Sequence, residues 1–268
     1  MGFVGFVVKN MPPQKDASMP SDPEILIYPS LAALQAATAE RLVALATQSV
    51  AAHGRALLAL SGGGTPLGVF RHLCAAPLRE RMPWGQLSVI WADERVVPFE
   101  HPASSYREAR QTLLDHVPIP SAQVYPVPTY YGPARAAEVY DQQVAALLAA
   151  HGGRLAIVLL GLGPDGHTAS LFPGFPQLDA PPEALALAVT GSPKPPPERV
   201  TLTAHALNRA DYALFLVAGA DKAAAVRATL RGPYNPHVTP AQLVRPPQGQ
   251  VIWMLDAAAN YLGSPQVQ

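Results

Sequence analysis

The sequence has few of the features that would assign it to a specialised class of protein. It contains a single cysteine, Cys74, which excludes an internal disulfide framework and a cysteine-based zinc site. Positive and negative side chains balance at 19 each, so no basic surface points to a nucleic acid. The apolar run near the N-terminus is far too short to span a bilayer. These absences favour a protein of the reducing cytoplasm, with neither a nucleic acid nor a membrane as its partner.

The first residues differ in character from the rest of the chain. Residues 1–21 lack the basic start of a signal peptide and contain Pro12, Pro13 and Pro20. We expect them to form a disordered leader. The remaining chain shows no internal repeat and no clear linker, which predicts a single domain over residues 22–268.

The most informative stretch runs from Leu155 to Gly174. Its apolar residues 155–160 predict a strand buried on both faces, as in a parallel sheet. A turn at residues 161–164 follows, and then Asp165 and His167. Ligands of open α/β sheets bind outside the carboxyl ends of the strands, where this turn would lie. A capped turn with a surface histidine would have the same sequence, so other strand ends must support the interpretation.

A glycine-rich loop follows another predicted strand, residues 56–60. The loop carries Ser61, Gly62, Gly63, Gly64 and Thr65, and helical spacing resumes over residues 67–75. Free backbone N–H groups and the helix dipole make such a loop an anion site, with phosphate as the obvious ligand. We expect Thr65 to cap the helix. The lysine and spacing of a Walker loop are absent, and a tight turn is the plainer alternative.

Charged side chains follow three further predicted strands. Asp93 and Arg95 come after the strand at residues 87–91, either as a solvated turn or as an active-site edge. Lys194 lies in a run of prolines that fixes its position, unless it is an ordinary loop lysine. Lys222 follows the strand at residues 212–218. Carboxyl ends of parallel strands share one edge of a sheet, so these groups are expected to converge.

The order of elements predicts the fold class. Helices are expected over residues 31–52, 67–75, 103–116, 134–150 and 223–230, and strands over residues 56–60, 87–91, 155–160, 184–189, 199–203, 212–218 and 251–255. A short helix is expected after Asp256. Alternating strands and helices predict an α/β fold: an open, mainly parallel, Rossmann-like sheet with helices on both faces.

Five segments together resemble a known family. In this order and at these intervals, SGGGTP, DERVVP, GLGPDGHTASLFPG, SPKPPPERVTL and AGADK are similar to the 6-phosphogluconolactonase family. That family belongs to a wider group of sugar-phosphate enzymes that includes glucosamine-6-phosphate deaminase, with a NagB-like architecture. The resemblance implies hydrolysis of 6-phosphoglucono-δ-lactone in the oxidative pentose phosphate pathway, without a metal or an organic cofactor. It implies a small-molecule substrate for a monomer or homodimer.

The resemblance also implies roles for individual residues. His167 would be the general base, and Asp165 would orient it, although the two need not touch. Arg95 and Lys194 are candidates for the carbonyl oxygen and the phosphate, with Arg95 counted among the catalytic residues. The residues expected to bind substrate are Ser61, Gly62, Gly63, Gly64, Thr65, Asp93, Lys194, Arg199 and Lys222.

One departure from the family pattern and two rival functions complete this interpretation. Ser105 stands where the family usually has an asparagine, so the role of that amide is in doubt here. Deaminase relatives typically carry a glutamate where this chain has Phe172, which argues against ring-opening chemistry. A sugar-phosphate sensor is the second rival, but the residues before Asp22 are too few and too rich in proline for a helix-turn-helix.

Overall fold

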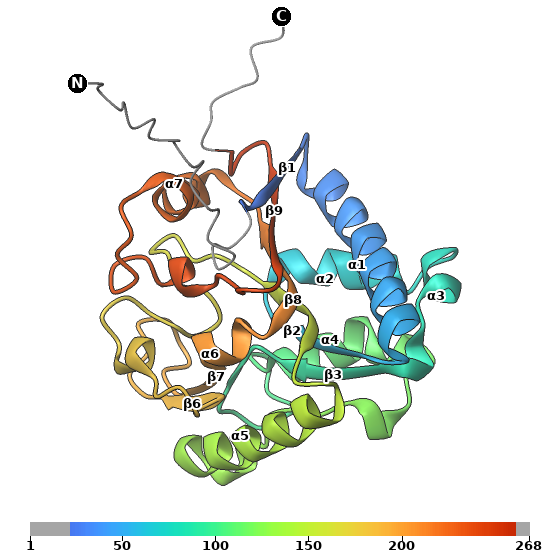
Figure 1. Ribbon diagram of the computed structural model, residues 1–268, viewed down its shortest axis with the longest axis horizontal. Coiled ribbons are helices and arrows are strands. Elements are labelled where there is room, and N and C mark those ends of the chain that lie inside the picture. The colour runs from blue at the N-terminus through green and yellow to red at the C-terminus, as the bar shows by residue number, and fades with distance from the viewer. Residues whose placement is uncertain (1–21, 261–268) are drawn as a thin grey trace, which may run out of the picture.

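The computed structural model describes residues 22–260 and centres them on a six-stranded sheet (Figure 1). All neighbouring strands are parallel. In spatial order they are β1 (Glu24–Tyr28), β9 (Gln250–Asp256), β8 (Ala210–Val217), β5 (Leu155–Leu160), β2 (Ala56–Leu60) and β3 (Leu87–Trp91). The predicted open parallel α/β sheet is confirmed. The predicted leader, residues 1–21, lies outside the described residues.

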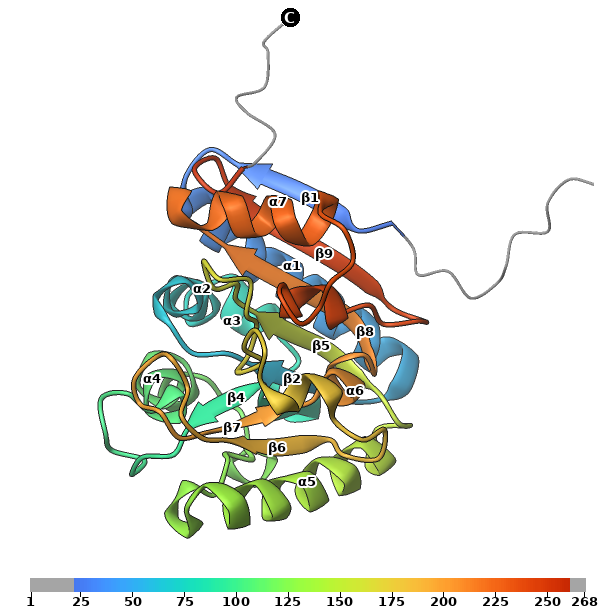
Figure 2. The same ribbon diagram turned by 90° about the vertical axis from the view of Figure 1, so that its left-hand side faces the viewer.

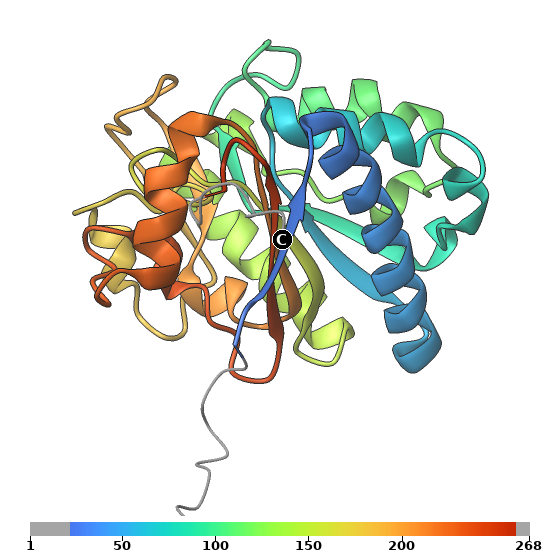
Figure 3. The same ribbon diagram turned by 90° about the horizontal axis from the view of Figure 1, so that it is seen from above.

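Helices cover both faces of this sheet, as predicted. Figure 3 shows α1 (blue) and α2 (cyan) on one side and α7 (orange) on the other. The helices are α1 (Leu31–His53), α2 (Gly64–Leu73), α3 (Leu78–Arg81), α4 (Ser105–Thr112), α5 (Pro133–Ala150), α6 (Ala204–Leu207) and α7 (Ala223–Arg231). Within residues 22–260, no helix is long and apolar enough to cross a membrane.

Local signals set the ends of the longest helix. Ser30 caps α1 by accepting a hydrogen bond from the Ala33 N–H at 3.2 Å. Gly54 ends the helix in the left-handed region, at φ +75°, where a residue without Cβ is favoured. One face of α1, including Leu34 and Leu42, is buried against the sheet. The cap and the apolar face explain why the sequence predicted this helix closely.

The core lies in and around the central strands. Every residue of β2, β3 and β5 is buried, as expected for parallel strands covered on both faces. On the neighbouring strands, Phe215 and Trp253 stack with ring centroids 4.1 Å apart and nearly parallel planes. These apolar contacts hold the sheet that carries the loops at its carboxyl edge.

A second, antiparallel sheet of three strands lies beside the first. Its order is β4 (Asp93–Arg95), β7 (Arg199–Leu202) and β6 (Ala186–Val189). Figure 2 shows α5 beneath β6. The Asp141 carboxylate of α5 accepts hydrogen bonds from Leu185 N–H at 2.7 Å and Ala186 N–H at 2.9 Å. This small sheet carries two of the segments whose charged residues were expected at the site.

The structure corrects several sequence-based boundaries. Residues 93–95 are a strand instead of a turn, and β1 was not predicted because this edge strand lacks a fully buried run. The helix expected at residues 103–116 spans only Ser105–Thr112 before a 3₁₀ turn. Residues 257–259 form a turn where a short helix was expected. Thr65 does not cap α2, because the helix begins earlier, with Gly63 as its N-cap residue.

Tyr140 joins α5 to the main sheet through a pair of hydrogen bonds. Its buried hydroxyl accepts from the Trp91 N–H at 2.8 Å and donates to the Trp91 carbonyl at 2.7 Å. We expect Tyr140→Phe to lower the free energy of unfolding by about 1–3 kcal/mol, because two buried backbone groups lose their partner. Urea denaturation measures the change. Tyr234→Phe, at a ring that is 59% exposed, is the control and should stay within about 0.5 kcal/mol of wild type.

Candidate active site

The main cavity with polar walls lies where the connections of the parallel sheet diverge. From β2 the chain continues to β3 on one side, and from β5 it continues to β8 on the other. Loops after such diverging strands leave a crevice between them. A cavity of about 500 Å³ is found there, lined by Ser61, Gly62, Asp93, Arg95, Gly161, Leu162, Gly163, Pro164, His167, Ala169, Lys194, Pro195, Arg199, Asp221 and Lys222.

The cavity brings together most of the residues that the sequence singled out. His167 and Gly62, from loops about a hundred positions apart, line the same space. Asp165 stands behind His167 and does not line the cavity. Gly63, Gly64 and Thr65 also lie outside its lining, so the glycine loop contributes only Ser61 and Gly62.

His167 and Asp165 form a direct hydrogen-bonded pair. The His167 Nδ1 bonds to the Asp165 Oδ1, and both side chains keep a minority of their surface exposed. Burial raises the pKa of Asp165, but the charge and hydrogen bonds of His167 outweigh burial, so the net pKa lies below its ordinary value. The carboxylate therefore stays ionised. In the neutral form of the imidazole, this partner favours the tautomer with the proton on Nδ1 and the lone pair on Nε2, which is the arrangement that a general base requires.

The backbone around His167 fits the ring closely. The Gly163 N–H donates to the His167 carbonyl at 2.8 Å, and the Gly166 N–H donates to the Gly163 carbonyl at 3.0 Å. A Cβ on Gly163 would lie 2.0 Å from His167 Nδ1, so only glycine fits there. The Phe172 ring packs against the imidazole, with centroids 4.6 Å apart. The ring orientation is thus fixed by packing as well as by Asp165.

A buried polar network forms the floor beneath these residues. The Ser170 hydroxyl donates to Asp93 Oδ2 at 2.6 Å, and Arg199 Nη1 lies 3.5 Å from the same oxygen. Arg199 also donates to the carbonyls of Lys194 at 3.1 Å and Pro196 at 3.3 Å. The Arg199 side chain is only 6% exposed and holds the proline loop. It also lines the cavity, and its role in substrate binding stays a prediction. Ser170 was missed, because no local pattern reveals its distant partner.

Glu94, next to Asp93, is another buried residue that the sequence did not single out for the site. It is fully buried, and its carboxylate accepts from the N–H groups of Arg95, Ser105 and Tyr106 at 2.7–2.8 Å. Burial raises the pKa of Glu94 and the N–H bonds lower it, with burial the larger effect, so the net pKa lies above its ordinary value. Glu94 thereby joins β4 to the start of α4, where a negative charge is favourable. Beside it, Arg95 Nη1 donates to the Ala103 carbonyl at 2.7 Å.

The cavity walls carry more positive than negative side chains. Arg95, Lys194, Arg199 and Lys222 line it, against the carboxylates of Asp93 and Asp221. Asp93 is engaged by Arg199, and Asp221 lies 3.2 Å from Lys222 Nζ. This distribution suits an anion such as a phosphate.

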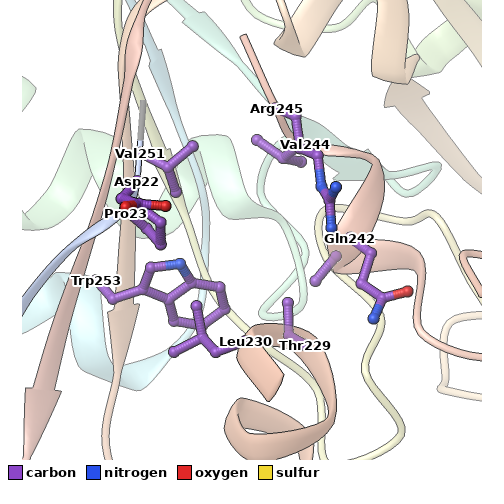
Figure 4. Close-up of a pocket in the computed structure, with 10 residues that line it drawn as sticks. Asp22, Pro23, Thr229, Leu230, Gln242, Val244, Arg245, Val251 and Trp253 are labelled. Carbon is purple, nitrogen blue, oxygen red and sulfur yellow. The ribbon is translucent and has the colours of Figure 1, made fainter. Parts of the chain in front are cut away.

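A second cavity offers much less chemistry. It measures about 270 Å³ and lies between α7 and the first half of β9, with Trp253, Leu230 and Val251 on its apolar wall (Figure 4). Asp22 and Arg245 are the charged groups on its rim, and it contains none of the predicted site residues. The cavity around His167 is therefore the candidate active site. Within residues 22–260, no three His, Cys, Asp or Glu side chains gather where a metal ion would fit.

Comparison with known proteins identifies the family. The model of the family described as glucosamine-6-phosphate isomerases/6-phosphogluconolactonase matches residues 29–253. The chain belongs to this family. It is 38% identical over 218 residues to a 6-phosphogluconolactonase from Synechocystis, covering 80% of this chain and 87% of the relative.

Solved structures agree with this assignment. A 6-phosphogluconolactonase from Trypanosoma brucei superposes with a TM-score of 0.76 at 30% identity, covering 89% of this chain and 97% of the other. A monomeric glucosamine-6-phosphate deaminase has a TM-score of 0.74 at 21% identity over 88% of this chain and 98% of the other. The similarity to the deaminase is one of fold, so it confirms the predicted architecture. It does not assign the reaction, which has to be argued from the residues of the site.

The contact between Asp165 and His167 has a consequence for stability. A carboxyl whose pKa is lowered on folding stabilises the folded state above its unfolded pKa of about 3.9, and this contribution is lost as the pH falls through the lower folded pKa. Asp165→Asn should therefore flatten the loss of stability in acid below about pH 4. Urea denaturation across that range tests this. Asp179→Asn, in a largely exposed pair with His237, should change the profile less.

Proposed function

We propose that the chain hydrolyses 6-phospho-D-glucono-1,5-lactone to 6-phosphogluconate, a step of the oxidative pentose phosphate pathway. The observation that carries this proposal is the lining of one cavity: an oriented imidazole stands together with four cationic side chains. Family membership supports it, since relatives similar along most of the chain bear the name of this activity.

In the proposed mechanism, His167 Nε2 takes a proton from water while the water oxygen bonds to the lactone carbonyl carbon. The carbonyl electrons move to its oxygen, and the resulting oxyanion collapses with cleavage of the ring ester bond. The imidazolium returns the proton to the departing ring oxygen, which becomes a hydroxyl. Asp165 stabilises the imidazolium in between, and positioned proton transfer of this kind typically contributes about 10²- to 10⁴-fold.

The cationic residues divide by how firmly the protein already holds them. The Arg199 guanidinium already donates to the Lys194 carbonyl and pairs with Asp93. We therefore assign Arg199 to holding the backbone at Lys194 in position. Lys194 is exposed at the rim, and Lys222 has only Asp221 as an ionic partner among the described residues. We assign these two lysines to the phosphate and Arg95 to the lactone oxygens. Holding the phosphate places the distant carbonyl for attack.

The site favours hydrolysis over the deaminase alternative. Phe172, where deaminase relatives typically have a glutamate, is fully buried against the imidazole. The side chain at this position therefore supplies no carboxylate to help open a sugar ring. Release of ammonia from glucosamine 6-phosphate by the purified chain would contradict the lactonase assignment.

The direct test is turnover. With EDTA present, the purified chain should hydrolyse 6-phosphogluconolactone faster than the spontaneous reaction, as measured by acid release in a weakly buffered solution. Loss of the activity with EDTA would contradict the proposal that no metal takes part. We further propose that the enzyme acts in the cytoplasm, as a monomer or homodimer.

His167→Ala separates the enzyme from a sugar-phosphate sensor. We expect kcat to fall by about 10²- to 10⁴-fold, because the general base is lost. Binding of 6-phosphogluconate, measured by calorimetry, should persist, because the cationic residues remain. Wild-type protein that binds the ligand without turnover would support the sensor instead.

Lys194→Ala tests the assignment of the phosphate. We expect kcat/KM for the phosphorylated lactone to fall by about tenfold or more, because a charge-assisted contact of about 1.5–3 kcal/mol is lost. The value for plain gluconolactone should change much less. Equal losses on both substrates would move Lys194 to the carbonyl end. The matched control is Arg135→Ala, which removes a surface charge from an exposed pair with Glu138 and should leave both values unchanged.

A further inference from the structure

The helix that follows the glycine loop begins without a capping group of its own. Its N-cap residue is Gly63, no side chain caps it, and its first turn contains no acidic residue. The start of a helix presents free N–H groups and the positive end of the helix dipole. An anion from elsewhere is therefore favoured at this point.

Glu108 supplies that anion from the neighbouring helix α4. Its Oε2 accepts a hydrogen bond from the Gly63 N–H at 3.1 Å. The same oxygen is 3.2 Å from the point where a Cβ on Gly62 would stand. Among residues 22–260, no cationic side chain forms an ion pair with Glu108 within 4.0 Å. Its negative charge is therefore available to repel another anion beside the loop.

A second observation at this place points to a missing ligand. Ser105 is 2% exposed, and its Oγ has no hydrogen-bond partner. That oxygen faces the loop, because a Cβ on Gly62 would lie 2.4 Å from it. Buried polar groups without a partner are uncommon and costly, so an uncompensated hydroxyl beside free helix N–H groups is suited to an incoming acceptor.

We propose that Glu108 is a specificity-determining residue that occupies the anion site of the glycine loop and competes with phosphate for it. A phosphate oxygen would take the Gly63 N–H once the Glu108 side chain rotates away, and Ser105 would donate to the same group. The identity of the phosphorylated ligand rests on the proposed function. The competition between Glu108 and phosphate for the loop does not depend on that function.

Glu108→Gln tests the competition, since it keeps the size and the hydrogen-bond acceptor but removes the charge. Calorimetric titration of the full chain with inorganic phosphate should give about five- to tenfold tighter binding in the variant, because a nearby like charge no longer repels the phosphate. The matched control is Glu100→Gln, an exposed carboxylate paired with Arg110 at 3.1 Å. Its phosphate affinity should stay within about twofold of wild type.

A kinetic measurement extends the test to the substrate. In Glu108→Gln, kcat/KM for the phosphorylated lactone should rise relative to the value for plain gluconolactone, through a lower KM. If the protein proves to have no lactonase activity, the phosphate titration still decides the role of Glu108. Circular dichroism checks folding, and Glu108→Ala replaces the glutamine variant if that one fails to fold. Phosphate binding that is unchanged or weaker in the folded variant overturns the proposal.

Discussion

The site depends on one constraint, the divergence of the chain between β2 and β5. These parallel strands are neighbours, and their onward connections leave in opposite directions. Their carboxyl ends therefore open onto a common crevice. The glycine loop enters it from β2 and the His167 loop from β5. The smaller sheet closes a further side, because β4 and β7 deliver Asp93 and Arg199 to the same space.

Buried charge holds these loops in place. Glu94 is fully enclosed yet satisfied by three backbone N–H groups, and Asp93 is satisfied by Ser170 and Arg199. Asp93 joins segments that are distant in sequence, and Glu94 joins β4 to the start of α4. Breaking such a group costs more than an ordinary surface contact, because its partner would stay buried and unpaired. The rigidity of the site therefore comes from polar contacts under its floor, while the apolar core supports the sheet behind it.

The sequence predicted the parts of the molecule whose signals are local. The strands at residues 56–60 and 155–160 agree with the structure because both are continuous apolar runs. The edge strand β1 has no such run, and the charged strand β4 is recognisable only through its partner β7. The convergence of His167 and Lys222 followed from the topology of the parallel strands, whereas Lys194 reaches the cavity on the connection between the antiparallel strands β6 and β7. The contacts of Ser170 and Glu108 link distant positions through side-chain contacts, which no spacing pattern encodes.

Gly163 also affects how reagents other than the substrate can reach the His167 ring. With the backbone on one side, Phe172 packed against the ring, and Nδ1 engaged by Asp165, the imidazole has a single open edge. An electrophilic reagent that enters the cavity thus finds one reactive nitrogen and yields one regioisomer.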